Sequence, residues 1–276
     1  MKKLILIKLG GSVITDKGKA FTSRPLVIKR LAKEIKIARE KLGKDTLFLI
    51  GHGSGSFGHT IASKYQTQKG LINKRSLAGS AGKESVKGFC LTADAAIEIN
   101  RIVIKEFLKI GLPVAAFSPL SFLYAKKNKL YKFMLNNIKK CFDIGIIPVI
   151  YGDVIMDESM DFCIFSAEKT LGVLARKLRK IYKIEKIVEC GDTDGVYDAK
   201  GKTIGVINNK NFNKIRKDIS GSKSTDVTGG MIHKVEESLK LARETKIKTL
   251  IINGNRGGDL VKAILGKKVK STQISV

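Results

Sequence analysis

The chain has 276 residues, and 43% of them are hydrophobic, so it can bury the core of one large α/β domain or of two smaller lobes. Its 52 basic residues outnumber 25 acidic ones, and the formal net charge of +27 raises the question of nucleic-acid binding. Only ten of the basic residues are arginine, the lysines are spread along the whole chain, and tryptophan is absent. We therefore interpret the charge as a lysine-rich solvated surface that attracts anionic substrates.

The first apolar run, residues 4–7, is cut by Lys8 and is too short for a signal peptide or a membrane span. The cysteines are far apart and have neither C-x-x-C spacing nor a neighbouring histidine, although a metal or disulfide role stays open. We expect a cytoplasmic protein with four reduced thiols in its core: Cys90, Cys141, Cys163 and Cys190.

Short apolar segments alternate with segments of helical periodicity along the chain. We predict strands at residues 4–8, 46–50, 113–117, 146–151, 186–189 and 249–252. Apolar residues at helical spacing predict four helices: Leu31, Ile35, Ala38 and Leu42; Phe89, Ala93, Ile97, Ile104 and Leu108; Leu171, Leu174, Ala175 and Leu178; and Met231, Val235, Leu239 and Ala242. Residues 157–165 and 197–218 are expected to be strand-and-turn excursions from the core.

Strands that alternate with helices, several of them too apolar to have a solvent face, indicate a mainly parallel open sheet covered on both sides. No linker rich in proline, glycine or serine divides the chain. The sequence therefore predicts an α/β fold, a three-layer αβα sandwich with two lobes on one continuous sheet. In such sheets ligands bind beyond the carboxyl ends of the strands.

Glycine-rich and polar residues collect directly after the predicted strands. The segments read KLGGSVITDK (8–17), GHGSGSFGH (51–59), YGDV (151–154), GDTDGVYD (191–198) and GSKSTDVTGGMIHK (221–234). Glycine-rich backbone that leads into a helix offers N–H groups to phosphate. The first two loops are placed to share one polyphosphate, although neither matches a P-loop or a complete dinucleotide fingerprint.

These segments, in this order over nearly the whole chain, resemble the amino acid kinase superfamily, and GSFGH (55–59) resembles its isopentenyl phosphate kinase branch. Fosfomycin kinases of the same superfamily are the near alternative. The resemblance implies a single amino acid kinase domain, 1–276, with an acceptor lobe at about 1–165 and a nucleotide lobe at about 166–276. It also implies ATP, Mg²⁺ and a homodimer.

By this resemblance the reaction is ATP-dependent phosphorylation of isopentenyl phosphate to isopentenyl diphosphate, or phosphorylation of another small phosphate or phosphonate. Lys8 and Lys17 contact the transferring phosphate, and His59 donates a hydrogen bond to the acceptor phosphate. Lys8 also stands out without the resemblance, because a lysine that ends a buried apolar strand is rarely left unpaired. An alternative of another class stays open, a nucleic-acid-binding or regulatory protein that keeps the fold without the activity.

The resemblance also implies two sets of contacts and no metal ligand from the protein. ATP contacts fall on Lys8, Gly10, Gly11, Ser12, Ser54, Gly55, Asp192, Asp194, Tyr197, Gly230 and Lys234. Acceptor contacts fall on Gly53, Gly58, His59, Gly152, Ser166 and Ala167, and candidates for the acceptor's tail pocket are Phe89, Ala93, Ala96, Ile97 and Ile104. We interpret His52 as structural and His233 as a helix-surface residue.

The sequence departs from the family pattern at two places. Ser54 stands at the middle of the usual triple glycine, where its Cβ restricts φ. FSAEKT replaces the usual Ser-Gly-Asp-Asp, so Ala167 stands where the family has a substrate-facing glycine. Glu168 stands in place of the aspartate that orients the active-site lysines, and we expect it to pair with Lys8.

Overall fold

A computed structural model describes residues 1–71, 79–220 and 230–276. The helices are α1 Gly11–Ile14, α2 Pro25–Leu42, α3 Gly55–Tyr65, η1 Thr67–Lys69 (a 3₁₀ turn), α4 Ser80–Lys109, α5 Pro119–Phe122, α6 Asn136–Asp143, α7 Ala167–Leu178, α8 Phe212–Ser220, α9 Gly230–Thr245 and α10 Asp259–Ile264. The strands are β1 Lys3–Leu9, β2 Thr46–His52, β3 Val114–Phe117, β4 Leu123–Lys126, β5 Lys129–Phe133, β6 Ile147–Tyr151, β7 Asp153–Asp157, β8 Asp161–Phe165, β9 Lys183–Gly191, β10 Val206–Ile207, β11 Thr249–Asn253 and β12 Ser271–Ile274.

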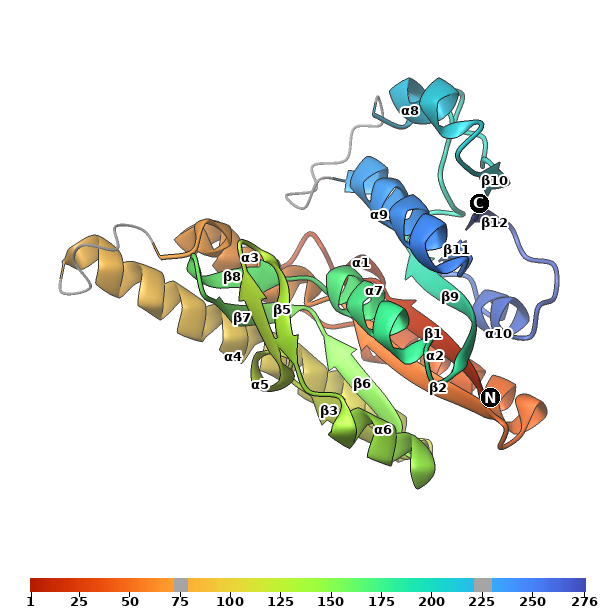
Figure 1. Cartoon of the computed structure of the whole chain (residues 1–276), viewed down its shortest axis with the longest axis horizontal. Coiled ribbons are helices and arrows are strands. Elements are labelled where there is room, and N and C mark those ends of the chain that lie inside the picture. Colours follow the sequence, from red (N-terminus) through yellow and green to blue (C-terminus); the bar gives the residue numbers. More distant parts are fainter. Residues whose placement is uncertain (72–78, 221–229) are drawn as a thin grey trace.

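Within the described residues, eight strands form one continuous sheet in the order β10-β12-β11-β9-β1-β2-β6-β3 (Figure 1). Neighbouring strands are parallel except for β11 and β12. The six predicted strands are confirmed as β1, β2, β3, β6, β9 and β11. The apolar runs of β1, β2 and β6 are buried on both faces, whereas the edge strand β3 is only partly buried. The short strands β10 and β12 were not predicted.

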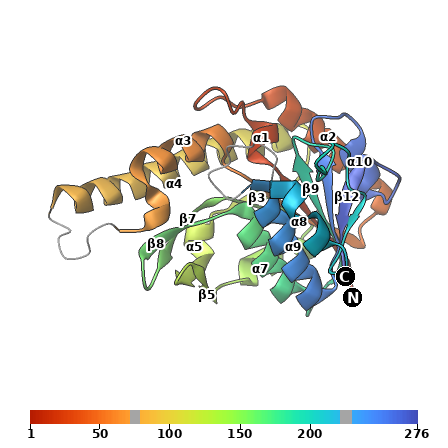
Figure 2. The same cartoon turned by 90° about the horizontal axis from the view of Figure 1, so that it is seen from above.

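Helices cover both faces of this sheet, which confirms the three-layer αβα architecture (Figures 1 and 2). On β1, Ile5, Ile7 and Leu9 pack in one core with α2, α4 and α10. Leu4 and Leu6 point to the opposite face and pack with α6 and α7. The alternation of side chains along a strand therefore sends consecutive residues of β1 into different cores.

A second sheet, β5-β4-β7-β8, lies beside the outer part of α4. The excursion predicted at 157–165 is a hairpin of this sheet, although it begins earlier, at Asp153. The excursion predicted at 197–218 is correct only in its first part, where Tyr197 and Thr203 form a β-bridge. From Phe212 the chain is helical, because its apolar residues recur at helical spacing against α9.

Two predictions about burial are wrong. Cys90 is exposed and Cys141 is partly buried, so only Cys163 and Cys190 lie in the core. On α4, Ile97 is 45% exposed and Leu108 52% exposed, although both were expected on the apolar face of this helix. No helix in the described part of the chain is long and apolar enough to cross a membrane.

Candidate active site

The two glycine-rich loops contact each other through their backbones at the carboxyl ends of β1 and β2. A Cβ added to Gly11 would lie 2.6 Å from the backbone nitrogen of Gly55, and one added to Gly53 would lie 2.9 Å from the nitrogen of Gly11. Gly55 also has a φ of +51°, a conformation that other residues rarely adopt. Glycine is therefore required here because the loops touch, and this contact joins them into one surface.

Each loop runs into a helix, α1 at Gly11 and α3 at Gly55. The first N–H groups of a helix have no intrahelical acceptor and are suited to an anion. Two of the expected donors are already engaged, which corrects the sequence-based assignment. The N–H of Gly10 donates to Cys190 O at 2.8 Å, and that of Gly53 donates to Leu9 O at 3.0 Å.

Ser54 is accommodated without strain in the second loop. Its φ of −80° is an ordinary helical value, and it is the residue that precedes α3. The side chain of Ser54 occupies the space that a Cβ at Gly58 would need. The serine in the middle of the loop therefore requires the glycine one turn later.

Lys8 is almost fully buried at the end of β1, with 6% of its side chain exposed, and forms an ion pair with Glu168 in the first turn of α7. The expected Lys8–Glu168 pair is confirmed. Burial alone would raise the pKa of Glu168, but the charge and hydrogen bond of Lys8, with help from Lys234, lower that pKa to about 2. Glu168 is thus a fixed negative charge that holds the ammonium of Lys8.

The start of α7 differs from the sequence-based expectation at Ala167. Its side chain is 1% exposed and packs in the core, so the methyl group does not face a substrate. Ser166 caps the helix by accepting a hydrogen bond from the N–H of Lys169 at 3.3 Å. Gly152 donates its N–H to His52 O at 2.9 Å, and a Cβ there would lie 3.2 Å from the nitrogen of Ala167.

Sequence reasoning missed a second carboxylate beside Lys8. Glu189 on β9 is the register partner of Lys8 in the parallel β1–β9 pair, so the two side chains leave the same face of the sheet. Burial raises the pKa of Glu189, and the charge of Glu168 adds to the rise against the opposite effects of Lys8 and Lys234. Only the register of the two strands identifies this residue.

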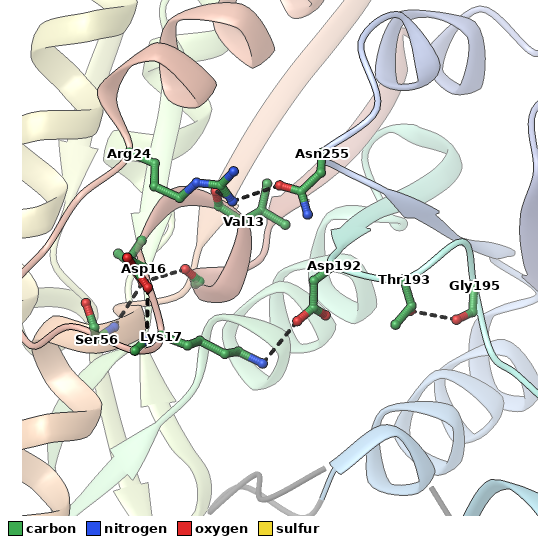
Figure 3. A network of polar contacts seen from close by, with 12 residues as sticks. Val13, Asp16, Lys17, Arg24, Ser56, Asp192, Thr193, Gly195 and Asn255 are labelled. Atoms are coloured by element: carbon green, nitrogen blue, oxygen red, sulfur yellow. Dashed lines mark hydrogen bonds and ion pairs between the residues drawn. The ribbon is translucent and has the colours of Figure 1, made fainter. Parts of the chain in front are cut away.

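Lys17 extends toward Asp192 in the loop that follows β9, residues 191–198, as Figure 3 shows. Its Nζ lies 3.1 Å from Asp192 Oδ2, and the two side chains are 60% and 43% exposed. Burial would raise the pKa of Asp192, but Lys17 and, more weakly, Lys234 lower it. Lys234 lies one turn into α9, which begins at Gly230, whereas residues 221–229 of the motif lie outside the described residues.

Asp194, expected to contact ATP, lies in a buried network of protein partners in this loop. Its carboxylate is buried and accepts hydrogen bonds from Asn253 at 2.9 Å and Arg256 at 2.7 Å, and it also pairs with Lys270 at 2.9 Å. The N–H of Asp194 donates to the hydroxyl of Tyr197 at 3.1 Å. Asp194 and Tyr197 therefore hold the loop together.

The three histidines have different environments. His59 is an exposed residue of α3. His233 is exposed on α9, as predicted. His52 is fully buried, donates from Nδ1 to Gly53 O at 3.0 Å, and accepts from the Nδ2 of Asn100 at 3.0 Å. Burial lowers the pKa of His52 to about 4, so it is a neutral structural residue, as expected.

A second buried network lies at the carboxyl end of β6. Asp153 is 3% exposed, and it accepts hydrogen bonds from Ser118 Oγ at 3.1 Å and from the N–H of Val154 at 2.8 Å. Burial raises the pKa of Asp153 to about 7, although both hydrogen bonds act to lower it. The YGDV segment indicated a strand end at this place, but nothing in the sequence indicated the burial of the carboxyl group.

The expected tail-pocket residues on α4 divide into two groups. Ala93, Ala96 and Ile104 are buried, whereas Ile97 is exposed. Phe89 packs against Phe162 of β8, with ring centroids 5.0 Å apart. The helix therefore meets the second sheet through Phe89.

The chain matches known proteins over its length. The model of the amino acid kinase family matches residues 3–253. An isopentenyl phosphate kinase of Methanocaldococcus jannaschii is 31% identical over 98% of both chains, and one of Methanothermobacter thermautotrophicus is 30% identical over 99% of both. A solved structure of an isopentenyl phosphate kinase superposes with a TM-score of 0.80 at 27% identity, over 98% of this chain and all of the other. The chain therefore belongs to the amino acid kinase family and, within it, to the isopentenyl phosphate kinase branch.

Proposed function

We propose that this protein transfers the terminal phosphate of ATP to isopentenyl phosphate and forms isopentenyl diphosphate. The buried Lys8–Glu168 pair beside two touching glycine loops is the observation that carries the proposal. Phosphoryl transfer needs alignment and neutralisation of charge more than covalent help, and a fixed ammonium at a glycine cradle supplies both. The relatives named isopentenyl phosphate kinase support the choice of acceptor.

On the nucleotide side, we assign Lys8, Lys17 and Lys234 to the phosphates of ATP. The N–H groups of the two loops join them, from Gly11, Ser12, Ser54 and Gly55. The close backbone contact between Gly11 and Gly55 brings these N–H groups together, which supports a shared phosphate. Mg²⁺, which would neutralise phosphate charge, is best held by the phosphates and water, since no cluster of three acidic, histidine or cysteine ligands occurs among the described residues.

On the acceptor side, we assign His59 as the donor to the acceptor phosphate. It is exposed in the first half of α3, next to Gly58. Residues 1–165 would then form the acceptor lobe and residues 166–276 the nucleotide lobe. The main sheet runs through both lobes, so the phosphate would pass between loops that a single sheet positions.

A coupled assay of ADP release tests this function with five acceptors: isopentenyl phosphate, dimethylallyl phosphate, fosfomycin, acetylglutamate and UMP. We expect the highest kcat/KM for the alkenyl monophosphates, because His59 and the positive field favour an anionic head group. Faster turnover of acetylglutamate or UMP would contradict the proposed acceptor class. Faster turnover of fosfomycin would favour a phosphonate kinase instead.

We also propose a cytoplasmic homodimer that uses the exposed face of α4. Val86, Ile97 and Leu108 are 42%, 45% and 52% exposed and recur every eleven residues, so they share one helix face. Asp94, Arg101 and Lys105 are exposed between them, so this face of the 30-residue helix would combine apolar and charged contacts in the dimer. Light scattering should show a dimer that Ile97→Glu converts to a monomer; a wild-type monomer would contradict this assembly.

A further inference from the structure

A pair of opposite charges occupies an otherwise uncharged row across the main sheet. At the level of Lys8, the register partners are Gly51 on β2 and Glu189 on β9, and Glu189 is followed by Ile251 on β11. In parallel strands, register partners direct their side chains to the same face. Lys8 and Glu189 therefore face the same layer, the one that contains α7 and α9.

The charged groups that face Glu189 come from three elements. Lys8 comes from β1, Glu168 from α7 and Lys234 from α9, and each influences the charge of Glu189. The β11 neighbour is the apolar Ile251. Beyond the strand end, Asp192 pairs with Lys17. Glu168 and Glu189 therefore face Lys8 and Lys234, and with all four side chains ionised their net charge is zero.

The two carboxylates of this group are not equivalent. Glu168 makes the direct ion pair with Lys8, and its pKa falls to about 2. For Glu189 the cost of burial and the charge of Glu168 outweigh the attraction of the lysines, so its pKa rises. Glu189 is therefore the carboxylate that gains a proton more easily when further negative charge arrives.

We propose that Glu189 takes up a proton from solvent when the polyphosphate of ATP binds beside Lys8 and Lys234. The nucleotide brings several negative charges into a partly buried site, where charge repulsion is stronger than in water. Protonation of Glu189 removes one carboxylate charge. Lys8 and Lys234 then interact with the phosphates and with Glu168. This inference rests on the proposed function, because it requires phosphates near the two lysines.

Calorimetry of MgATP binding without acceptor, in two buffers of different ionisation enthalpy, measures this proton uptake. The variants are Glu189→Gln and, as a matched control, Glu185→Gln, which changes the same charge on the same strand where Glu185 pairs with Lys3 at 3.4 Å. At pH 8 we expect wild type and Glu185→Gln to take up more protons than Glu189→Gln, by at most about one proton, the capacity of a single carboxyl group. The affinity of wild type should then fall with rising pH relative to Glu189→Gln, by at most about tenfold per pH unit.

Equal proton uptake by the three proteins, with MgATP binding intact, would overturn this inference and leave the proposed function standing. No binding of MgATP by wild type would overturn both. The melting temperature is a second measurement: Glu189→Gln should melt at or above the wild-type temperature at pH 8, because a partly buried carboxylate with a raised pKa is removed. A clear fall would identify Glu189 as a structural partner of Lys8 and would overturn the proposal.

Discussion

The carboxyl edge of the main sheet has a charged half and a neutral half. At the ends of β1 and β9, buried or half-buried charges face one another, and Glu168 keeps its charge because Lys8 pairs with it. At the ends of β2 and β6, the buried polar groups have hydrogen bonds but no opposite charge. There His52 has a pKa of about 4 and is neutral, and Asp153 has a pKa of about 7.

Burial is common to both halves, so the difference lies in the partners. A carboxylate beside an ammonium stays ionised, whereas one that has only a hydroxyl and an N–H as partners titrates near neutral pH. The charged half is therefore suited to binding phosphates, because a phosphate can replace a carboxylate as the anionic partner of a lysine. The neutral half holds the second loop in place through His52 and Asn100. Each prediction below tests one side of this contrast.

The largest effect is expected at Lys8, the centre of the charged half. Lys8→Ala should lower kcat by at least about 100-fold and change the affinity for ATP by less than about tenfold, because a fixed cation acts most as the phosphoryl group detaches. Steady-state kinetics and nucleotide titration measure the two effects. Lys3→Ala, an exposed lysine on the same strand, is the control and should behave as wild type.

A Lys8→Ala enzyme that keeps more than about a third of the wild-type kcat would contradict this role. Lys8 would then be only the buried partner of Glu168. In that case the charged half of the sheet edge would stabilise the fold and would not act in the reaction.

His59 tests whether the acceptor phosphate is held from α3. His59→Ala removes a charge-assisted hydrogen bond worth about 1.5–3 kcal/mol, which is roughly a 10- to 150-fold loss of kcat/KM for isopentenyl phosphate. The KM for ATP should hardly change, and His59→Asn should recover part of the loss if its amide reaches the phosphate. Because His59 is exposed, the melting temperature should change little. A large fall in melting temperature with normal kinetics would show that the residue is structural.

Asp153 tests the neutral half through the pH dependence of stability. Its pKa of about 7 lies above the unfolded value near 3.8, so wild type has its full stability below about pH 4 and loses part of it as the pH rises through 7. Asp153→Asn cannot ionise and should be more stable than wild type at pH 8, by roughly 1–3 kcal/mol, and about equal at pH 4. Urea unfolding at the two pH values measures this. A variant that is less stable at pH 8 would show that the ionised carboxylate is a favourable partner of Ser118.

The strands that could be predicted from the sequence are mainly those whose two faces are both buried. Strands such as β1 and β2 are buried on both faces, so their apolar runs are unbroken. Strand β5 of the second sheet and helix α8 were not predicted, because both are short and much of their surface is exposed. The helix that carries His59 was not predicted, because its sequence is rich in glycine, which is typical of turns. Here the glycines at the start of the helix allow two loops to touch.

Site residues could be predicted where they belong to a sequence motif. They could not be predicted where their position depends on the pairing register of two strands. Lys8 and Glu168 were expected to meet, and they do. Glu189 was missed because its contact with Lys8 depends on the order and register of β1 and β9, which a single sequence does not contain. The buried ion pairs of Asp194 were not foreseen, because its partners Arg256 and Lys270 lie more than sixty residues away in the chain.

The smallest effect is expected at Asp192, at the exposed rim of the charged half. Its ion pair with Lys17 is largely solvated, so Asp192→Asn should cost less than about 1 kcal/mol of stability. The same change frees Lys17 for the phosphates and should lower the KM for ATP modestly, by about two- to threefold. Lys17→Ala should raise that KM, and the double variant should resemble Lys17→Ala, since Asp192 acts only through Lys17. If Asp192→Asn instead raises the KM about tenfold, Asp192 contacts the nucleotide directly, as the family resemblance implies, and its pair with Lys17 would break when ATP binds.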